Sequence, residues 1–122
     1  MEKKKVLVVD DEPHILKLVE YTLSKSGFEV ITGFVGQEAL KRAESDQPDL
    51  ILLDVMMPNM DGFETAKILK ENQETKHIPI VFLSAKTRFE DEWKGFESGA
   101  VDYIKKPFEP QHLVEKVNEH IL

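Results

Sequence analysis

The sequence has no cysteine, which excludes disulfide bonds and thiolate metal sites and fits a reducing cytoplasm. Long hydrophobic runs are also lacking near the N-terminus, where the apolar run from Val6 to Val9 is far too short for a signal peptide or a membrane span. Positively charged residues are outnumbered, because the chain has 16 Lys and Arg but 23 Asp and Glu, which gives a net charge of -7 at pH 7. This balance argues against direct binding to nucleic acid or an anionic membrane and favours cations or basic partners. We therefore expect a cytoplasmic protein.

The chain is short enough to predict one domain over residues 1–122. Hydrophobic residues make up 41% of it, which is enough for the core of an ordinary globular protein. It contains no internal repeat, linker or low-complexity stretch that would indicate a second unit.

Short apolar segments of strand length recur along the chain. The expected strands are 6–9, 28–32, 50–53, 80–83 and, more weakly, 101–104. The first, third and fourth are apolar at every position, a pattern typical of strands buried on both faces in a parallel sheet.

Amphipathic helical segments separate these strands. The expected helices begin at Pro13 and end before Gly27, span Gly36 to Asp46 before Pro48, follow a cap at Asp61, span Phe89 to Ser98, and begin at Glu109-Pro110. The alternation predicts an α/β fold of five βα units, a three-layer sandwich with a five-stranded parallel sheet covered by helices on both faces.

Chemically active residues follow the predicted strands. Asp10 and Asp11 follow the first strand, Asp54 follows the third, Ser84 the fourth, and Lys106 comes shortly after the fifth. Ligands of such sheets bind beyond the carboxyl ends of the strands, so these side chains should share one rim.

Three carboxylates on one rim repel one another and need compensation. A hard cation such as Mg²⁺ supplies it, because it prefers oxygen ligands and keeps free positions for a phosphoryl oxygen. Lys106 would offset the remaining charge, and the Ser84 hydroxyl could donate to a phosphoryl oxygen. Such a set can stabilise phosphoryl transfer to a carboxylate, which would form an acyl phosphate.

At this point the sequence resembles a known family. The segments that carry the resemblance are Val8-Val9-Asp10-Asp11-Glu12-Pro13, Pro48-Asp49-Leu50-Ile51-Leu52-Leu53-Asp54, Met57-Pro58 with Asp61-Gly62, and Tyr103-Ile104-Lys105-Lys106-Pro107-Phe108. In this order they look like the response-regulator receiver domains of two-component signal transduction, including the chemotaxis regulators. The resemblance covers nearly the whole chain and implies a flavodoxin-like strand order of 2-1-3-4-5.

The resemblance also implies a role for each site residue. Asp54 would be the phosphoacceptor and Lys106 would bind the phosphoryl group. Asp10, Asp11, Asp54 and the backbone carbonyl of Met56 would hold Mg²⁺, with Mn²⁺ as an alternative. Ser84 and Tyr103 would be the switch residues, and the Lys106–Pro107 peptide bond would be cis.

A receiver of this kind is a phosphorylation-activated switch and not an enzyme, since it catalyses only its own phosphorylation and dephosphorylation. Its phosphodonor would be a phosphohistidine on a sensor histidine kinase or a phosphotransfer protein. That partner would dock on the first helix of this chain, which includes Ile15 and Leu18. Its altered surface would be the fourth helix, fifth strand and fifth helix, which could also form a homodimer or contact an output domain. The fifth helix lacks arginines common in dimerising DNA-binding regulators, which favours a single-domain protein.

Three other functions fit parts of the pattern. A flavin carrier would need a hydroxyl- and glycine-rich phosphate loop where this chain has Asp10, Asp11 and Glu12. A metal-dependent phosphatase would usually have a second acid two residues after its nucleophile, where this chain has Met56. An interaction module with an inactive site is the least favoured alternative, because every residue expected of an active receiver site is present in this sequence.

Several residues receive simpler interpretations. The four histidines, His14, His77, His112 and His120, share no metal-ligand spacing and are expected on the surface. Asp49 is expected to be a loop or capping residue, and Trp93 is either a core residue or a contact residue. The sequence leaves open the kinase, the output, the oligomeric state, the lifetime of the phosphorylated form and whether the chain is a piece of a longer regulator.

Overall fold

The computed structural model describes residues 3–85, 94 and 96–121, and its centre is a parallel sheet with the strand order β2-β1-β3-β4-β5. The strands are β1 Lys5–Val9, β2 Glu29–Gly33, β3 Leu50–Asp54, β4 Ile80–Ser84 and β5 Asp102–Lys105. Every expected strand is present with its ends displaced by one residue at most, and the expected strand order is confirmed.

Helices connect the strands. The helices are α1 Pro13–Lys25, α2 Gly36–Asp46, α3 Gly62–Glu71 and α5 Pro110–His120. The expected fourth helix, 89–98, falls mostly on residues outside the described part of the chain, as does Trp93. Of that segment, Lys94, Phe96 and Glu97 have helical backbone.

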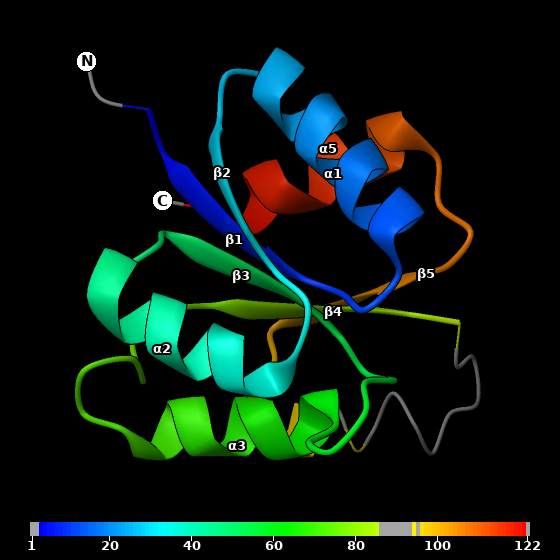
Figure 1. The fold of residues 1–122 in the computed structure, drawn as a ribbon. Helices are drawn as coiled ribbons and strands as arrows, with labels where there is room; N and C mark the ends of the chain where they lie inside the picture. Colours follow the sequence, from blue (N-terminus) through cyan, green and yellow to red (C-terminus); the bar gives the residue numbers. More distant parts are fainter. Residues whose placement is uncertain (1–2, 86–93, 95, 122) are drawn as a thin grey trace.

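The sheet lies between two helical layers (Figure 1). Helices α1 and α5 cover one face, where they pack on Val6, Val8, Leu50 and Leu52. Helices α2 and α3 cover the other face, packing on alternate residues of the same strands: Leu7, Val9, Ile51 and Leu53. All eight of these side chains are fully buried, which explains why β1 and β3 are apolar at successive positions.

Local signals set the helix ends. Pro13 occupies the first turn of α1, and Gly27 after its end has a φ of 95°. The Asp61 carboxylate caps α3 by accepting a hydrogen bond from the Glu64 N–H at 2.8 Å. Helix α2 ends before Pro48 because Gln47 adopts a left-handed conformation, with a φ of 47°.

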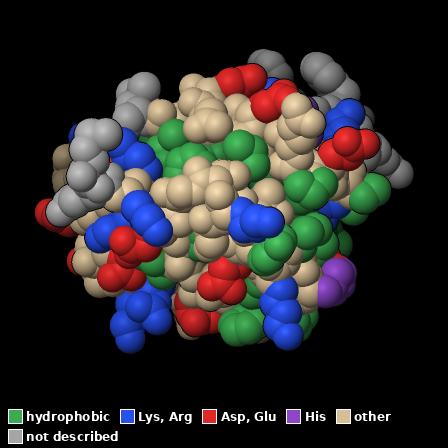
Figure 2. Space-filling model, turned by 90° about the horizontal axis from the view of Figure 1, so that it is seen from above, with side chains coloured by type: hydrophobic (Ala, Val, Ile, Leu, Met, Phe, Trp, Pro, Cys, Tyr) green, Lys and Arg blue, Asp and Glu red, His purple; other side chains and the backbone are tan. Residues whose placement is uncertain are grey.

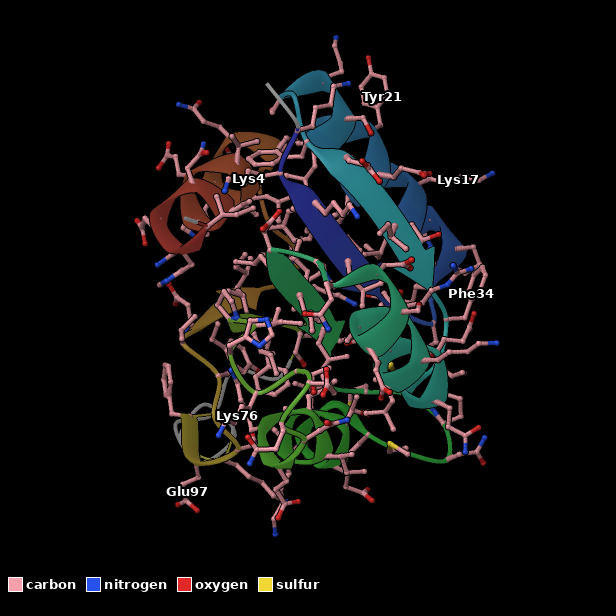
Figure 3. The ribbon with its side chains drawn as sticks, turned by 90° about the vertical axis from the view of Figure 1, so that its left-hand side faces the viewer. Lys4, Lys17, Tyr21, Phe34, Lys76 and Glu97 are labelled. Carbon is pink, nitrogen blue, oxygen red and sulfur yellow. The ribbon has the colours of Figure 1, made fainter. Side chains whose placement is uncertain are left out.

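The surface carries few large apolar side chains. Figure 2 looks down on the α1–α5 side and shows hydrophobic side chains lying between charged ones. Tyr21 on α1 and Phe34 after β2 are 63% and 50% exposed (Figure 3). No helix in the described part of the chain is both long and apolar enough to cross a bilayer.

Of the four histidines predicted to be surface residues, His120 is only partly exposed. Its ring is 23% exposed, and Nε2 lies 2.7 Å from Asp102 Oδ2. His120 falls on the last turn of α5, which brings its ring back to the start of β5. His14, His77 and His112 are exposed, as expected.

Candidate metal centre

The carboxyl ends of neighbouring strands bring four acids together. Asp10 directly follows β1 and Asp54 ends β3, and the register pairs Val9 with Leu53, so the two aspartates are neighbours. Carboxylate oxygens of Asp10, Asp11, Glu12 and Asp54 all lie within 4.8 Å of one another. The rim expected from the sequence is therefore present at β1 and β3.

The two central aspartates are buried. Asp10 is 0% exposed and Asp54 is 2% exposed. Asp10 Oδ1 accepts a hydrogen bond from the Glu12 N–H at 2.9 Å, and Asp54 Oδ1 accepts one from the Met56 N–H at 3.3 Å. Two backbone donors cannot balance two buried carboxylates, so the site needs a cation.

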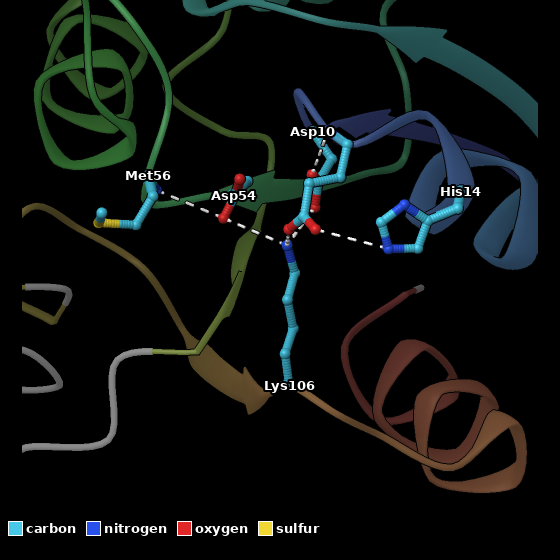
Figure 4. A network of polar contacts seen from close by, with 6 residues as sticks. Asp10, His14, Asp54, Met56 and Lys106 are labelled. Atoms are coloured by element: carbon cyan, nitrogen blue, oxygen red, sulfur yellow. Dashed lines mark hydrogen bonds and ion pairs between the residues drawn. The ribbon is translucent and has the colours of Figure 1, made fainter.

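Lys106 supplies one positive charge (Figure 4). Its Nζ lies 2.7 Å from Asp10 Oδ2, 3.0 Å from Glu12 Oε1 and 3.5 Å from Asp54 Oδ1. Burial lowers the pKa of Lys106, but its contacts with these three acids outweigh burial and raise the pKa overall. The lysine therefore stays charged and compensates part of the negative charge.

The compensation is incomplete at Asp54. Burial, followed by the charge of Asp10, raises the pKa of Asp54 to about 7, although Lys106 and the Met56 N–H act in the opposite direction. A carboxyl group with this pKa is poorly stabilised as an anion at neutral pH. A further cation beside it would favour the ionised, nucleophilic form.

The donor set fits a hard divalent cation. Asp10 Oδ2 is buried and lies 2.7 Å from the Lys106 ammonium, and a carboxylate oxygen has a second lone pair that remains for a metal. Asp11 is exposed and can complete the coordination from the solvent side. An all-oxygen set of this kind suits Mg²⁺ or Mn²⁺.

A second acidic group does not fit a metal as well. Asp102, Glu119 and His120 also lie close together. Here the Lys116 ammonium already lies 2.9 Å from Asp102 Oδ2 and 3.7 Å from Glu119 Oε2. This group is therefore an ion-pair network between β5 and α5.

The remaining predicted site residues lie on neighbouring strands and loops. Ser84 is fully buried at the end of β4, and its carbonyl accepts a hydrogen bond from the Lys106 N–H at 2.9 Å. The Lys106–Pro107 peptide bond is cis. The Tyr103 ring is 8% exposed and lies 6.3 Å from the Phe82 ring, so it points into the protein. Met56 is 57% exposed, and it contacts Asp54 through its backbone N–H.

A cleft of about 430 Å³ opens beside the acids. Asp11 lines one part of it, and the β3–α3 loop lines another through Met56, Met57 and Pro58. Lys94 also borders the cleft, with its Nζ 5.4 Å from the centre of the Phe63 ring. A small anionic reagent could reach the acids through this opening.

Glu12 is a site residue that the sequence analysis did not assign. Its carboxylate contacts Lys106, and this contact holds the pKa of Glu12 below its usual value. The feature of the sequence that could have indicated this role is that Glu12 is the third of three consecutive acids after β1. The sequence pattern does not predict the contact, because Glu12 lies between β1 and α1 as the N-cap residue, where neither the strand period nor the helix period sets the side-chain direction.

Comparison with known proteins identifies the relatives of this chain. The family model of the response regulator receiver domain matches residues 6–118. The alkaline phosphatase synthesis transcriptional regulatory protein PhoP of Bacillus subtilis is 49% identical over 114 residues, which are 93% of this chain and 47% of PhoP. The chain thus spans about half the length of this regulator.

Solved structures show the same architecture. The chemotaxis protein CheY4 of Vibrio cholerae has a TM-score of 0.94 and 37% identity, with 98% of this chain and 100% of that chain covered. The receiver domain of the sensor histidine kinase PA1611 of Pseudomonas aeruginosa has a TM-score of 0.90 and 26% identity, with 98% of each chain covered. That receiver domain is described with a magnesium ion coordinated in its active-site cleft.

Proposed function

Because the chain belongs to the response regulator receiver domain family of two-component systems, we propose that it is a phosphorylation-activated switch with Asp54 as the phosphoacceptor. The observation that carries the proposal is the cluster of buried Asp10 and Asp54 with Lys106 between them and Glu12. This arrangement provides a nucleophilic carboxylate, ligands for a divalent cation and a fixed ammonium on one rim.

The cation would be Mg²⁺, with Mn²⁺ as an alternative. Asp10, Asp11, Asp54 and the Met56 carbonyl would hold it, and it would neutralise charge on the phosphoryl group during transfer. The magnesium described in the PA1611 receiver domain supports this choice. Lys106 would bind a phosphoryl oxygen, because its ammonium lies 3.5 Å from Asp54 Oδ1.

The switch would work by population shift. Ser84 and Tyr103 would change arrangement when Asp54 carries a phosphoryl group, and the surface formed by α5, β5 and the fourth helix would change with them. Phe96 and Val101 support an interface here, because they are 47% and 44% exposed. A homodimer or an output domain could use this surface, and both stay predictions.

The donor would be a phosphohistidine on a sensor histidine kinase or phosphotransfer protein. Docking on α1 is supported by Leu18 and Tyr21, which are 39% and 63% exposed beside a groove shared with α5. On this proposal the domain has no external substrate and is not an enzyme beyond its own phosphorylation and dephosphorylation. It also binds no nucleic acid directly, and a cytoplasmic location stays a prediction.

Intact mass after incubation with acetyl phosphate tests the proposal. We expect wild type to gain one phosphoryl group only when Mg²⁺ is present, and Asp54→Asn to gain none. Asp49→Asn is the matched control, since Asp49 precedes the same strand at its other end and accepts a hydrogen bond from the Lys5 N–H at 2.8 Å. It should be phosphorylated like wild type. Labelling of Asp54→Asn, or none of wild type, would contradict the proposal.

The alternative functions have weaker support. The loop after β1 presents three acids to the rim, which would repel the phosphate of a flavin. Met56 occupies the position where a phosphatase of this chemistry would need its second acid. A colourless purified protein that accumulates an acyl phosphate would distinguish the switch from both.

A further inference from the structure

The Lys106 ammonium lies nearer to the acids that follow β1 than to Asp54. The Lys106 Nζ lies 3.0 Å from Glu12 Oε1 and 2.7 Å from Asp10 Oδ2, but 3.5 Å from Asp54 Oδ1. The ammonium is therefore closer to both of these acids than to the residue that would carry the phosphoryl group.

The Glu12 side chain does not cap its own helix. Glu12 is the N-cap residue of α1, but its side chain makes no capping hydrogen bond. Glutamate is not among the preferred capping residues, and its longer side chain reaches across to Lys106 here. The other carboxylate oxygen lies 3.5 Å from His14 Nε2. The side chain is thus held by two basic groups outside the helical hydrogen bonding.

We propose that Glu12 is a positioning residue that holds Lys106 back from Asp54 and competes with a phosphoryl group for the ammonium. The inference rests on the proposed function. A cation on Asp10 would share the charge of that carboxylate, so Glu12 would become the main rival for Lys106. At 46% exposure its carboxylate is partly solvated, so the contact can be exchanged at moderate cost.

Two substitutions of Glu12 separate the effect of its side-chain length from the effect of its charge, and a third substitution serves as the control. Glu12→Gln keeps the length and removes the charge, whereas Glu12→Asp keeps the charge and shortens the side chain by one methylene. Glu20→Gln, at an exposed position of α1, changes the net charge by the same amount as Glu12→Gln. Each variant is titrated with beryllofluoride, a phosphoryl mimic, at saturating Mg²⁺ by calorimetry.

We expect Glu12→Gln and Glu12→Asp to bind beryllofluoride about two- to fivefold more tightly than wild type, which is the range of a partly exposed ion pair. Glu20→Gln should bind like wild type. If Glu12→Asp also binds like wild type, the effect is one of charge alone and the inference is overturned. Unchanged affinity in both Glu12 variants overturns it as well.

Unfolding by urea without metal gives an independent reading. Glu12→Gln and Lys106→Met should have non-additive effects on stability, because each removes one partner of the same contact. Additive effects would show that Glu12 and Lys106 do not interact in the metal-free protein, which would overturn the inference. Wild type that binds no beryllofluoride and gains no phosphoryl group would instead show that the proposed function itself is wrong.

Discussion

Gly62 lies so close to the backbone carbonyl of Asp54 that a β-carbon at position 62 would overlap with it. The Gly62 N–H also donates a hydrogen bond to the Val55 carbonyl at 2.8 Å. The first turn of α3 is thereby packed directly on the end of β3. This close approach requires glycine and holds the backbone that carries the predicted phosphoacceptor.

Gly62→Ala should therefore destabilise the protein and disturb the site. We expect a loss of about 1–3 kcal/mol in the free energy of unfolding, because the overlap is with backbone that cannot rotate away. Urea unfolding without metal measures it. Gly33→Ala is the control, since a β-carbon there would approach no atom closer than 3.2 Å. Equal losses in the two variants would contradict the explanation.

Much of this fold could be predicted from the sequence, because its signals are strong and local. The apolar runs at β1, β3 and β4 identify buried strands, and their alternation with amphipathic helices leaves few possible topologies. The site followed from the same reasoning, since residues after parallel strands meet at one edge. The structure places Asp10 beside Asp54 for this reason.

The contacts that the sequence did not predict depend on side-chain direction. Glu12 and His120 lie at opposite ends of different helices, and each reaches a partner distant in sequence: Lys106 for Glu12 and Asp102 for His120. A helical period predicts which face is buried, but not how far a long polar side chain extends beyond the helix end.

Asp54→Asn should stabilise the metal-free protein at pH 8. The pKa of Asp54 is raised to about 7 in the folded state, so its ionised form is disfavoured there relative to the unfolded chain. Wild type should thus lose stability relative to Asp54→Asn as the pH rises from about 4 to 7. At pH 8 we expect a difference of about 1–3 kcal/mol in urea unfolding.

Two observations check the cause of this difference. Mg²⁺ should stabilise wild type more than Asp54→Asn, because a ligand that binds the folded state raises its stability. Asp49→Asn should not be stabilised at pH 8, since Asp49 accepts a backbone hydrogen bond that the folded state uses. An equal gain in both aspartate variants would show that general charge reduction is responsible.

Lys106→Met should separate metal binding from phosphoryl binding. Removing the ammonium leaves Asp10 and Asp54 uncompensated, so the metal-free protein should lose about 2 kcal/mol of stability. Mg²⁺ should then bind more tightly, because no ammonium competes for Asp10, whereas the gain of a phosphoryl group should be lost. Calorimetry with Mg²⁺ and intact mass after acetyl phosphate measure the two effects.

Lys105→Met provides the matched control for Lys106→Met. Lys105 is the adjacent residue and is exposed at the end of β5, so the substitution changes the charge equally without touching the acids. It should leave both Mg²⁺ affinity and phosphorylation close to wild type. Weaker Mg²⁺ binding in Lys106→Met would mean that the lysine supports the metal site instead of competing with it.

Asp102→Asn should cost stability in a pH-dependent way. Asp102 Oδ2 lies 2.9 Å from the Lys116 ammonium and 2.7 Å from His120 Nε2. Burial raises the pKa of Asp102, but the hydrogen bonds from His120 and Lys116 outweigh it and lower the pKa below 3.8. An acid of this kind contributes stability above its unfolded pKa, and the contribution is lost as the pH falls through the lower folded pKa.

We therefore expect Asp102→Asn to lose about 1 kcal/mol at pH 7 and progressively less toward pH 3, measured by urea unfolding. Lys116 has a raised pKa because of the same contact, so the difference should also shrink at strongly alkaline pH. Glu119→Gln is the control, because Glu119 is 57% exposed and lies 3.7 Å from Lys116 and 3.8 Å from His120. Its effect should be smaller at every pH. A loss for Asp102→Asn that persists unchanged at pH 3 would show that packing, and not the ion pair, joins α5 to β5.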